Sequence, residues 1–131
     1  MGDVNAGPTA VTSTAVKMKV TDLWLTQEIL LALGRAIASW GTLREADRRG
    51  LQSALKGIRL TEILRLAPTG RGTIDLTVKC IRAWMTVVEI IKGRVLSARV
   101  VDNSDRIRAL ARLKRLRLLL TNYIQLELAL M

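Results

Sequence analysis

Several residue types on which enzymes rely are missing or scarce in this chain of 131 residues. It contains no histidine, no phenylalanine and a single cysteine, Cys80. Without histidine, a cysteine nucleophile has no imidazole to activate it, and general acid–base and metal sites lose their commonest side chain. No pair of carboxylates falls on a common face of a predicted helix either. We therefore expect no enzyme activity, no cofactor and no metal site, and we interpret Cys80 as a small hydrophobic core residue.

Long apolar runs are absent as well. No uninterrupted run approaches the roughly 18 residues of a transmembrane helix, and the first residues lack the basic and then apolar pattern of a secretory signal. A membrane is therefore not expected as the primary partner. Asparagine and glutamine are also scarce, at three each, and depletion of thermolabile side chains is typical of thermophilic proteins.

The chain is rich in aliphatic residues and in positive charge. Half of its residues are apolar, and 21 basic against 11 acidic residues leave a net charge of +10. A surplus of this size indicates a polyanionic partner, either nucleic acid or an acidic membrane surface. Arginine outnumbers lysine 15 to 6, and the planar guanidinium group suits bidentate contacts to phosphate.

Hydrophobic periodicity predicts an all-α fold, a four-helix bundle-like domain over residues 21–131 after an extended N-terminal arm over residues 1–20. The arm has too little apolar surface to order itself, so we expect a neighbouring subunit or a ligand to hold it. No internal repeat of 20 to 50 residues is apparent. The predicted helices run from Thr21 to Trp40, from just after Gly41 with a kink or division before IRLTEILRL, from Thr73 to Val101 with an interruption at Gly93, and from Asn103 or Ser104 onward.

The strongest functional signal is the stretch SDRIRALARLKRLRLLLTNYIQLELALM, residues 104–131. Its first half holds six basic residues on two helical stripes, and no acid follows Asp105 to pair with them at helical spacing. We interpret this half as a phosphate-binding surface, with a solvated face or a membrane surface as the alternatives. Its second half is almost wholly apolar and would favour aggregation if exposed. Part of this apolar half must close the core of the bundle. We expect its remaining apolar side chains to form a subunit interface.

Two weaker candidates lie earlier in the chain. In the loop APTGRGT, Gly70 and Gly72 flank Arg71 just before a predicted helix start, where free amides favour an anion. A plain turn and a backbone–phosphate contact both stay open there. The second helix has the small-residue spacing of a helix-turn-helix at Ala46 and Gly50, but charged residues stand where that motif needs apolar ones. An ordinary amphipathic helix is the favoured interpretation.

The candidate sites are thus of two kinds. The candidate nucleic-acid-binding residues are Lys17, Lys19, Arg44, Arg48, Arg49, Lys56, Arg71, Arg106, Arg108, Arg112, Lys114, Arg115 and Arg117. The candidate subunit-interface residues are Leu118, Leu119, Tyr123, Ile124, Leu126, Leu128, Leu130 and Met131.

The layout of the chain resembles that of the major coat proteins of filamentous and rod-shaped viruses of hyperthermophilic archaea. The features that carry the resemblance are the small-residue arm MGDVNAGPTAVTSTAVKMKV, the helical bundle from Thr21 and the segment RIRALARLKRLR. The resemblance implies a virion protein whose arm and helices wrap double-stranded DNA held in A-form. It also implies self-association, or pairing with a related coat subunit.

The net charge of the chain gives an estimate of the length of DNA that one subunit would cover. Double-stranded DNA carries about one charge per 1.7 Å, so a subunit of this net charge would balance about ten phosphates, or about five base pairs. The alternative is a small dimeric, all-helical accessory or regulatory protein that binds double-stranded RNA or DNA in the cytoplasm of the host cell.

Overall fold

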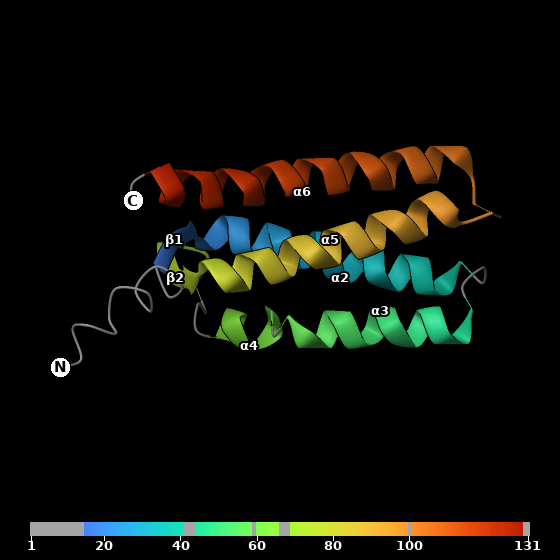
Figure 1. The fold of residues 1–131 in the computed structure, drawn as a ribbon, viewed down its shortest axis with the longest axis horizontal. Helices are drawn as coiled ribbons and strands as arrows, with labels where there is room; N and C mark the ends of the chain where they lie inside the picture. The colour runs from blue at the N-terminus through green and yellow to red at the C-terminus, as the bar shows by residue number, and fades with distance from the viewer. Residues whose placement is uncertain (1–14, 41–43, 59, 66–68, 100, 130–131) are drawn as a thin grey trace.

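The computed structural model describes residues 15–40, 44–58, 60–65, 69–99 and 101–129, with the backbone alone for residues 60, 61, 64 and 126–129. It confirms the all-α bundle and adds a small two-stranded ribbon (Figure 1). In chain order the elements are β1 (Ala15–Lys19), α2 (Val20–Ser39), α3 (Glu45–Gly57), α4 (Leu60–Arg65), β2 (Thr73–Thr77), α5 (Val78–Ser97) and α6 (Asn103–Ala129).

The helices form three layers. Helices α2 and α5 lie in the middle, with α6 on one side and α3 and α4 on the other (Figure 1). Both central helices run away from the ribbon, and α3 and α6 return toward it. The core between the layers is aliphatic except for Trp84, whose indole Nε1 donates a hydrogen bond to the backbone oxygen of Ile58 at 3.2 Å. That bond fixes the end of α3 against α5.

The ribbon was not predicted. In β1, Val16 and Met18 are buried while Lys17 and Lys19 are exposed, which is the period of two of a strand with one face on the core. The strand brings residues 15–19 of the expected arm into the fold, and residues 1–14 lie outside the described part of the chain. The predicted helix start at Thr73 is wrong, because residues 73–77 form β2. Helix α5 begins after Thr77, whose side-chain oxygen accepts a hydrogen bond from the amide of Cys80 at 3.1 Å.

The other helix boundaries lie close to the predictions, with one exception. The second helix divides where expected, since α3 ends at Gly57 and α4 follows. In contrast, α5 continues through Gly93, where an interruption was predicted. A single helical glycine costs only about 1 kcal/mol relative to alanine. The burial of Ile91 and Val95 on either side of it outweighs that cost.

The two halves of the chain repeat one pattern of strand, long helix and returning helix. Each element of the second half begins 58 positions after its counterpart, as Ala15 and Thr73, Val20 and Val78, and Glu45 and Asn103 show (73 − 15, 78 − 20, 103 − 45). Strands β1 and β2 are both 5 residues long, and α2 and α5 are both 20. The halves differ after the third element, because α6 is continuous where α3 ends at Gly57.

The buried positions repeat with the same offset. Fully or nearly buried pairs are Met18 and Leu76, Val20 and Val78, Leu23 and Ile81, Ile29 and Val87, Leu30 and Val88, Leu33 and Ile91, Ile37 and Val95, Leu51 and Ala109, and Ile58 and Leu116. In the antiparallel ribbon, Lys17 of β1 lies opposite Asp75 of β2, and these two residues are also related by the offset of 58 positions. The bundle is therefore two βαα halves related by an approximate twofold axis that passes through the ribbon and along the bundle.

Candidate nucleic-acid interface

Helix α6 presents a row of unpaired cations to solvent. Its core face is made by Leu113, Leu116 and Leu120, so the basic side chains between them point outward. No carboxylate among the described residues lies within 4.0 Å of these cations. The exposed side chains concerned are Arg108, Arg112, Lys114 and Arg115.

Two other arginines of α6 have partners inside the fold. Arg117 Nε lies 3.4 Å from Glu89 Oε1 on α5, and both side chains are about half exposed. The half-buried guanidinium of Arg106 donates a hydrogen bond to the backbone oxygen of Ala98, just after α5. Arg106 was predicted to bind nucleic acid, but the structure gives it a contact that secures the turn between α5 and α6. An exposed ion pair such as Arg117 with Glu89 is weak and can open toward a phosphate.

Helix α3 stands in the equivalent position of the other half and provides an internal comparison. The arginines of α3 form ion pairs with a carboxylate on the same helix. Arg48 Nη1 and Arg49 Nε lie 4.0 Å and 3.4 Å from the carboxylate of Glu45. Asp47 of α3 pairs with Arg94 of α5 at 3.1 Å. Over residues 45–57, three cations face two acids. Over the matching residues 103–115 of α6, five cations face one acid. The basic surplus is therefore concentrated on one of the two outer layers.

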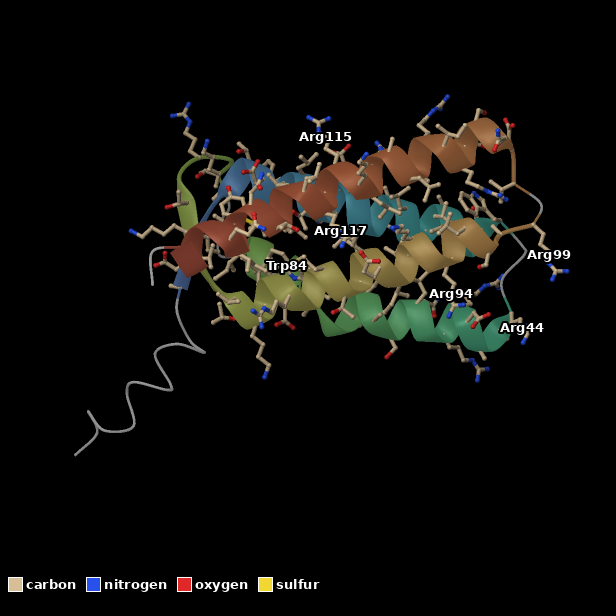
Figure 2. The ribbon with its side chains drawn as sticks, turned by 45° about the horizontal axis from the view of Figure 1, so that its top comes forward. Arg44, Trp84, Arg94, Arg99, Arg115 and Arg117 are labelled. Carbon is tan, nitrogen blue, oxygen red and sulfur yellow. The ribbon has the colours of Figure 1, made fainter. Side chains whose placement is uncertain are left out.

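The remaining basic candidates are dispersed. Lys17 and Lys19 lie on the exposed face of β1, at the ribbon end of the bundle. Figure 2 shows Arg44 at the opposite end, near Arg94 and Arg99. Lys56 is exposed on α3. The structure thus does not bring all of the predicted basic residues onto one surface.

The loop at Arg71 is a turn that leads into a strand. A backbone–phosphate site there required the free amides of a helix start, and β2 follows instead. Gly72 adopts a positive φ of 83°, and its carbonyl accepts a hydrogen bond from the amide of Val20 at 3.0 Å. The turn therefore joins the ribbon to α2, while the Arg71 side chain stays exposed.

The apolar end of α6 closes the core more than was expected. Ile124 is buried, and Leu119 and Tyr123 are half-buried against the core. The Tyr123 hydroxyl donates to a carboxylate oxygen of Asp22 and accepts from the backbone amide of Lys19 at 3.2 Å. Burial raises the pKa of Tyr123, and the hydrogen bond to Asp22 raises it further. Leu118 stays 57% exposed, while the side chains of Leu126, Leu128, Leu130 and Met131 lie outside the described part.

One feature of α6, the exposed side chain of Ile107, was missed in the sequence. Ile107 is 59% exposed, and it lies on the same outward face as Leu118, about three helical turns away. In Figure 2, Arg115 points away from the bundle, while Arg117 lies toward α5. The spacing of Ile107 and Leu118 is visible in the sequence, but only the buried positions of α6 show which of its many apolar residues face outward.

Cys80 is half-buried on α5, and burial raises the pKa of its thiol. It lines a hollow of about 740 Å³ where α3 gives way to α4. Within the described ranges, we find neither a group of three or more potential metal-binding side chains nor a helix long and apolar enough to cross a membrane.

Comparison of the chain with protein-family models, curated proteins and solved structures finds no match.

Proposed function

We propose that this chain is a structural protein that binds double-stranded nucleic acid, with DNA as the favoured form, through phosphate contacts from α6 and without reading sequence. The observation that supports the proposal best is the uncompensated row of Arg108, Arg112, Lys114 and Arg115. Exposed cations on a rigid helix neutralise phosphates and release counterions, which is sufficient for sequence-independent binding.

The second part of the proposal is self-assembly along the duplex as a helical virion coat. It is supported by the layout of the chain, by its net charge of +10 and by apolar side chains left exposed on α2 and α5, Trp24 and Leu96. The packing of Tyr123 and Ile124 within the chain leaves less apolar surface for a filament and favours the alternative, a small dimeric accessory or regulatory protein that binds double-stranded RNA or DNA. Negative-stain microscopy of the purified protein with DNA separates the two, since filaments support the coat and discrete particles support the accessory protein.

The phosphate contacts are tested with the double variant Arg112→Gln/Arg115→Gln. Each phosphate contact contributes about 0.9 to the slope of log affinity against log salt concentration, so we expect the slope for duplex DNA to fall by about 1.8. The matched control is Arg49→Gln/Lys56→Gln, which removes two exposed cations from the equivalent helix α3 and should leave the slope nearly unchanged. Equal losses in the two variants would show that binding depends on net charge alone and would contradict a surface on α6.

A further inference from the structure

We propose that α6 lies in the major groove of duplex DNA, with an apolar crest directed at the base edges and a basic flank on each side. This inference rests on the proposed function, because it specifies how the same helix meets the duplex. It adds to the phosphate contacts a preference for thymine, which phosphate binding alone does not give. The inference depends on which faces of α6 carry apolar and basic side chains, whereas the proposed function depends only on the exposed positive charge of the helix.

The crest is the outermost face of α6, opposite its core face. Ile107 and Leu118 are 59% and 57% exposed on this face, and the small residue Ala111 is exposed between them. The buried residues Leu113 and Leu116 define the opposite direction. More than half of the surface of Ile107 and of Leu118 stays in contact with solvent, so the crest is available to a partner.

Cations flank the crest on both sides. On one side lie Arg108 and Arg112, and the outward-pointing Arg115 joins them near the crest (Figure 2). On the other side, toward α5, lies Lys114, which lines a groove of about 300 Å³ with Lys92 and Leu96 of α5 and with Arg117, the ion-pair partner of Glu89. From Arg106 to Gln125 the helix contains no acidic residue. A ligand that fits this surface carries two separate lines of negative charge with a less charged floor between them.

The major groove of B-form DNA has this form, unlike the deep, narrow major groove of the A-form duplex that the coat-protein resemblance implies. It is about 12 Å wide, it is bordered by the two phosphate backbones, and it admits one α-helix, whose diameter with side chains is about 10–12 Å. Its floor carries the thymine methyl groups, which accept apolar contacts.

The equivalent helix of the other half lacks the crest. The counterpart of Ile107 is Arg49, which pairs with Glu45. The counterpart of Ala111 is Ser53. Because the two helices share one fold but only α6 combines an apolar crest with basic flanks, the combination is not a requirement of the bundle. It points to a partner of α6.

Groove binding is tested with chemically blocked duplexes. Fluorescence anisotropy measures binding to three forms of one mixed-sequence duplex. The first is unmodified. In the second, glucosylated 5-hydroxymethylcytosine replaces cytosine and fills the major groove, and in the third netropsin occupies the minor groove. We expect glucosylation to weaken binding by about tenfold or more and netropsin to have little effect. Loss of binding with netropsin alone would overturn the major-groove assignment.

The crest itself is tested by removing the thymine methyl groups. Replacing thymine by uracil should weaken binding about fourfold for each methyl group that the crest covers. The variant Ile107→Ser/Leu118→Ser should lose this dependence on the methyl group and keep its salt slope. The control is Ala46→Ser, which changes an exposed apolar side chain on α3, on the opposite side of the bundle, and should behave like the unaltered protein.

The outcomes separate the inference from the function on which it rests. Equal binding to all of these duplexes, with an unchanged salt slope, would overturn groove binding and leave phosphate binding by α6 intact. Absence of binding to any duplex at low salt would remove the proposed function and the inference with it. Circular dichroism of each variant confirms that serine at these exposed positions leaves the helices in place.

Discussion

At the scale of single residues, the same side-chain type has different roles in different surroundings. Arg115 points into solvent, while Arg106, nine positions earlier on the same helix, is half-buried and donates to the backbone oxygen of Ala98 (Figure 2). Tyr123 was expected at a subunit interface, and its hydroxyl instead joins the end of α6 to Asp22 near the start of α2. Residue type and local spacing do not distinguish these cases, because the deciding contacts come from other helices.

The Tyr123 contact predicts a loss of stability at alkaline pH. Because burial and Asp22 raise the pKa of Tyr123 in the folded chain, the folded state holds the hydroxyl proton more tightly than the unfolded state. This stabilising contribution is complete below the ordinary tyrosine pKa of about 10 and is lost as the pH rises through the folded pKa. Tyr123 is the only tyrosine, so phenolate absorbance follows its titration directly.

The variant Tyr123→Phe supplies the control. It should lower the free energy of unfolding at neutral pH by about 1–2 kcal/mol through loss of the hydrogen bond, and it should show a weaker decline above pH 10. Every other side chain is the same in the two proteins, so the comparison isolates the hydroxyl of Tyr123. A phenolate titration at or below the ordinary pKa in the folded protein would contradict the contact with Asp22.

At the scale of elements, packing decides where a helix stops. Gly57 and Gly93 were both predicted to weaken their helices, yet α3 ends at Gly57 and α5 continues through Gly93. Neither glycine has another atom within 4 Å of the position of an added Cβ, so sterics at the glycine do not explain the difference. Gly93 lies between the buried Ile91 and Val95, whereas the chain after Gly57 turns so that Ile58 can accept the hydrogen bond from Trp84.

Glycine substitutions test this account. Gly93→Ala should raise the free energy of unfolding by about 1 kcal/mol, because alanine favours the helix and the site has open space. Gly34→Ala makes the same change within α2, but its Cβ would lie 2.6 Å from Leu55 Cδ1 on α3. Leu55 must then move, so Gly34→Ala should stabilise less than Gly93→Ala or should destabilise. Chemical denaturation of both variants measures the difference, and an equal gain at the two sites would contradict the close packing of α2 on α3.

At the scale of the whole molecule, the approximate twofold axis organises the fold. It places α2 and α5 together in the centre and sets α6 against α3 and α4 on opposite sides (Figure 1). The two outer layers then diverge in chemistry, because α3 carries acids that pair with its arginines and α6 does not. The unpaired basic side chains are therefore concentrated on one side of a repeated architecture.

The axis predicts that matched core substitutions in the two halves act alike. Leu23 and Ile81 are counterparts on α2 and α5, and each has a relative exposure of 0%. Leu23→Ala and Ile81→Ala should each lower the free energy of unfolding by about 2–5 kcal/mol. Because the two helices share one core, unfolding should remain a single transition in both variants. Separate transitions of the two halves, seen as different midpoints by far-ultraviolet circular dichroism and tryptophan fluorescence, would contradict a shared core.

Much of the helical fold was predictable, and the ribbon was not. Long amphipathic helices are visible because their apolar period extends over many residues, as in α2 and α5. The segments AVKMK and TIDLT are only 5 residues each and run directly into helices, so their alternation merges with the helical pattern that follows. The repeat was also hidden, because its offset exceeds 50 residues and the halves share patterns of burial more than residue identity.

The sequence by itself determined the helical class, the aliphatic core, the net charge of +10 and the concentration of unpaired cations on the last helix, since these follow from composition and short-range spacing. Only the tertiary structure decided which of these residues are available to a partner. It turned Arg106 toward the backbone, packed Ile124 into the core and left Ile107 and Leu118 exposed between basic flanks. The physical reason is that the exposure of a side chain depends on neighbours that are distant in the sequence, and here those neighbours are supplied by the packing of two βαα halves around one axis.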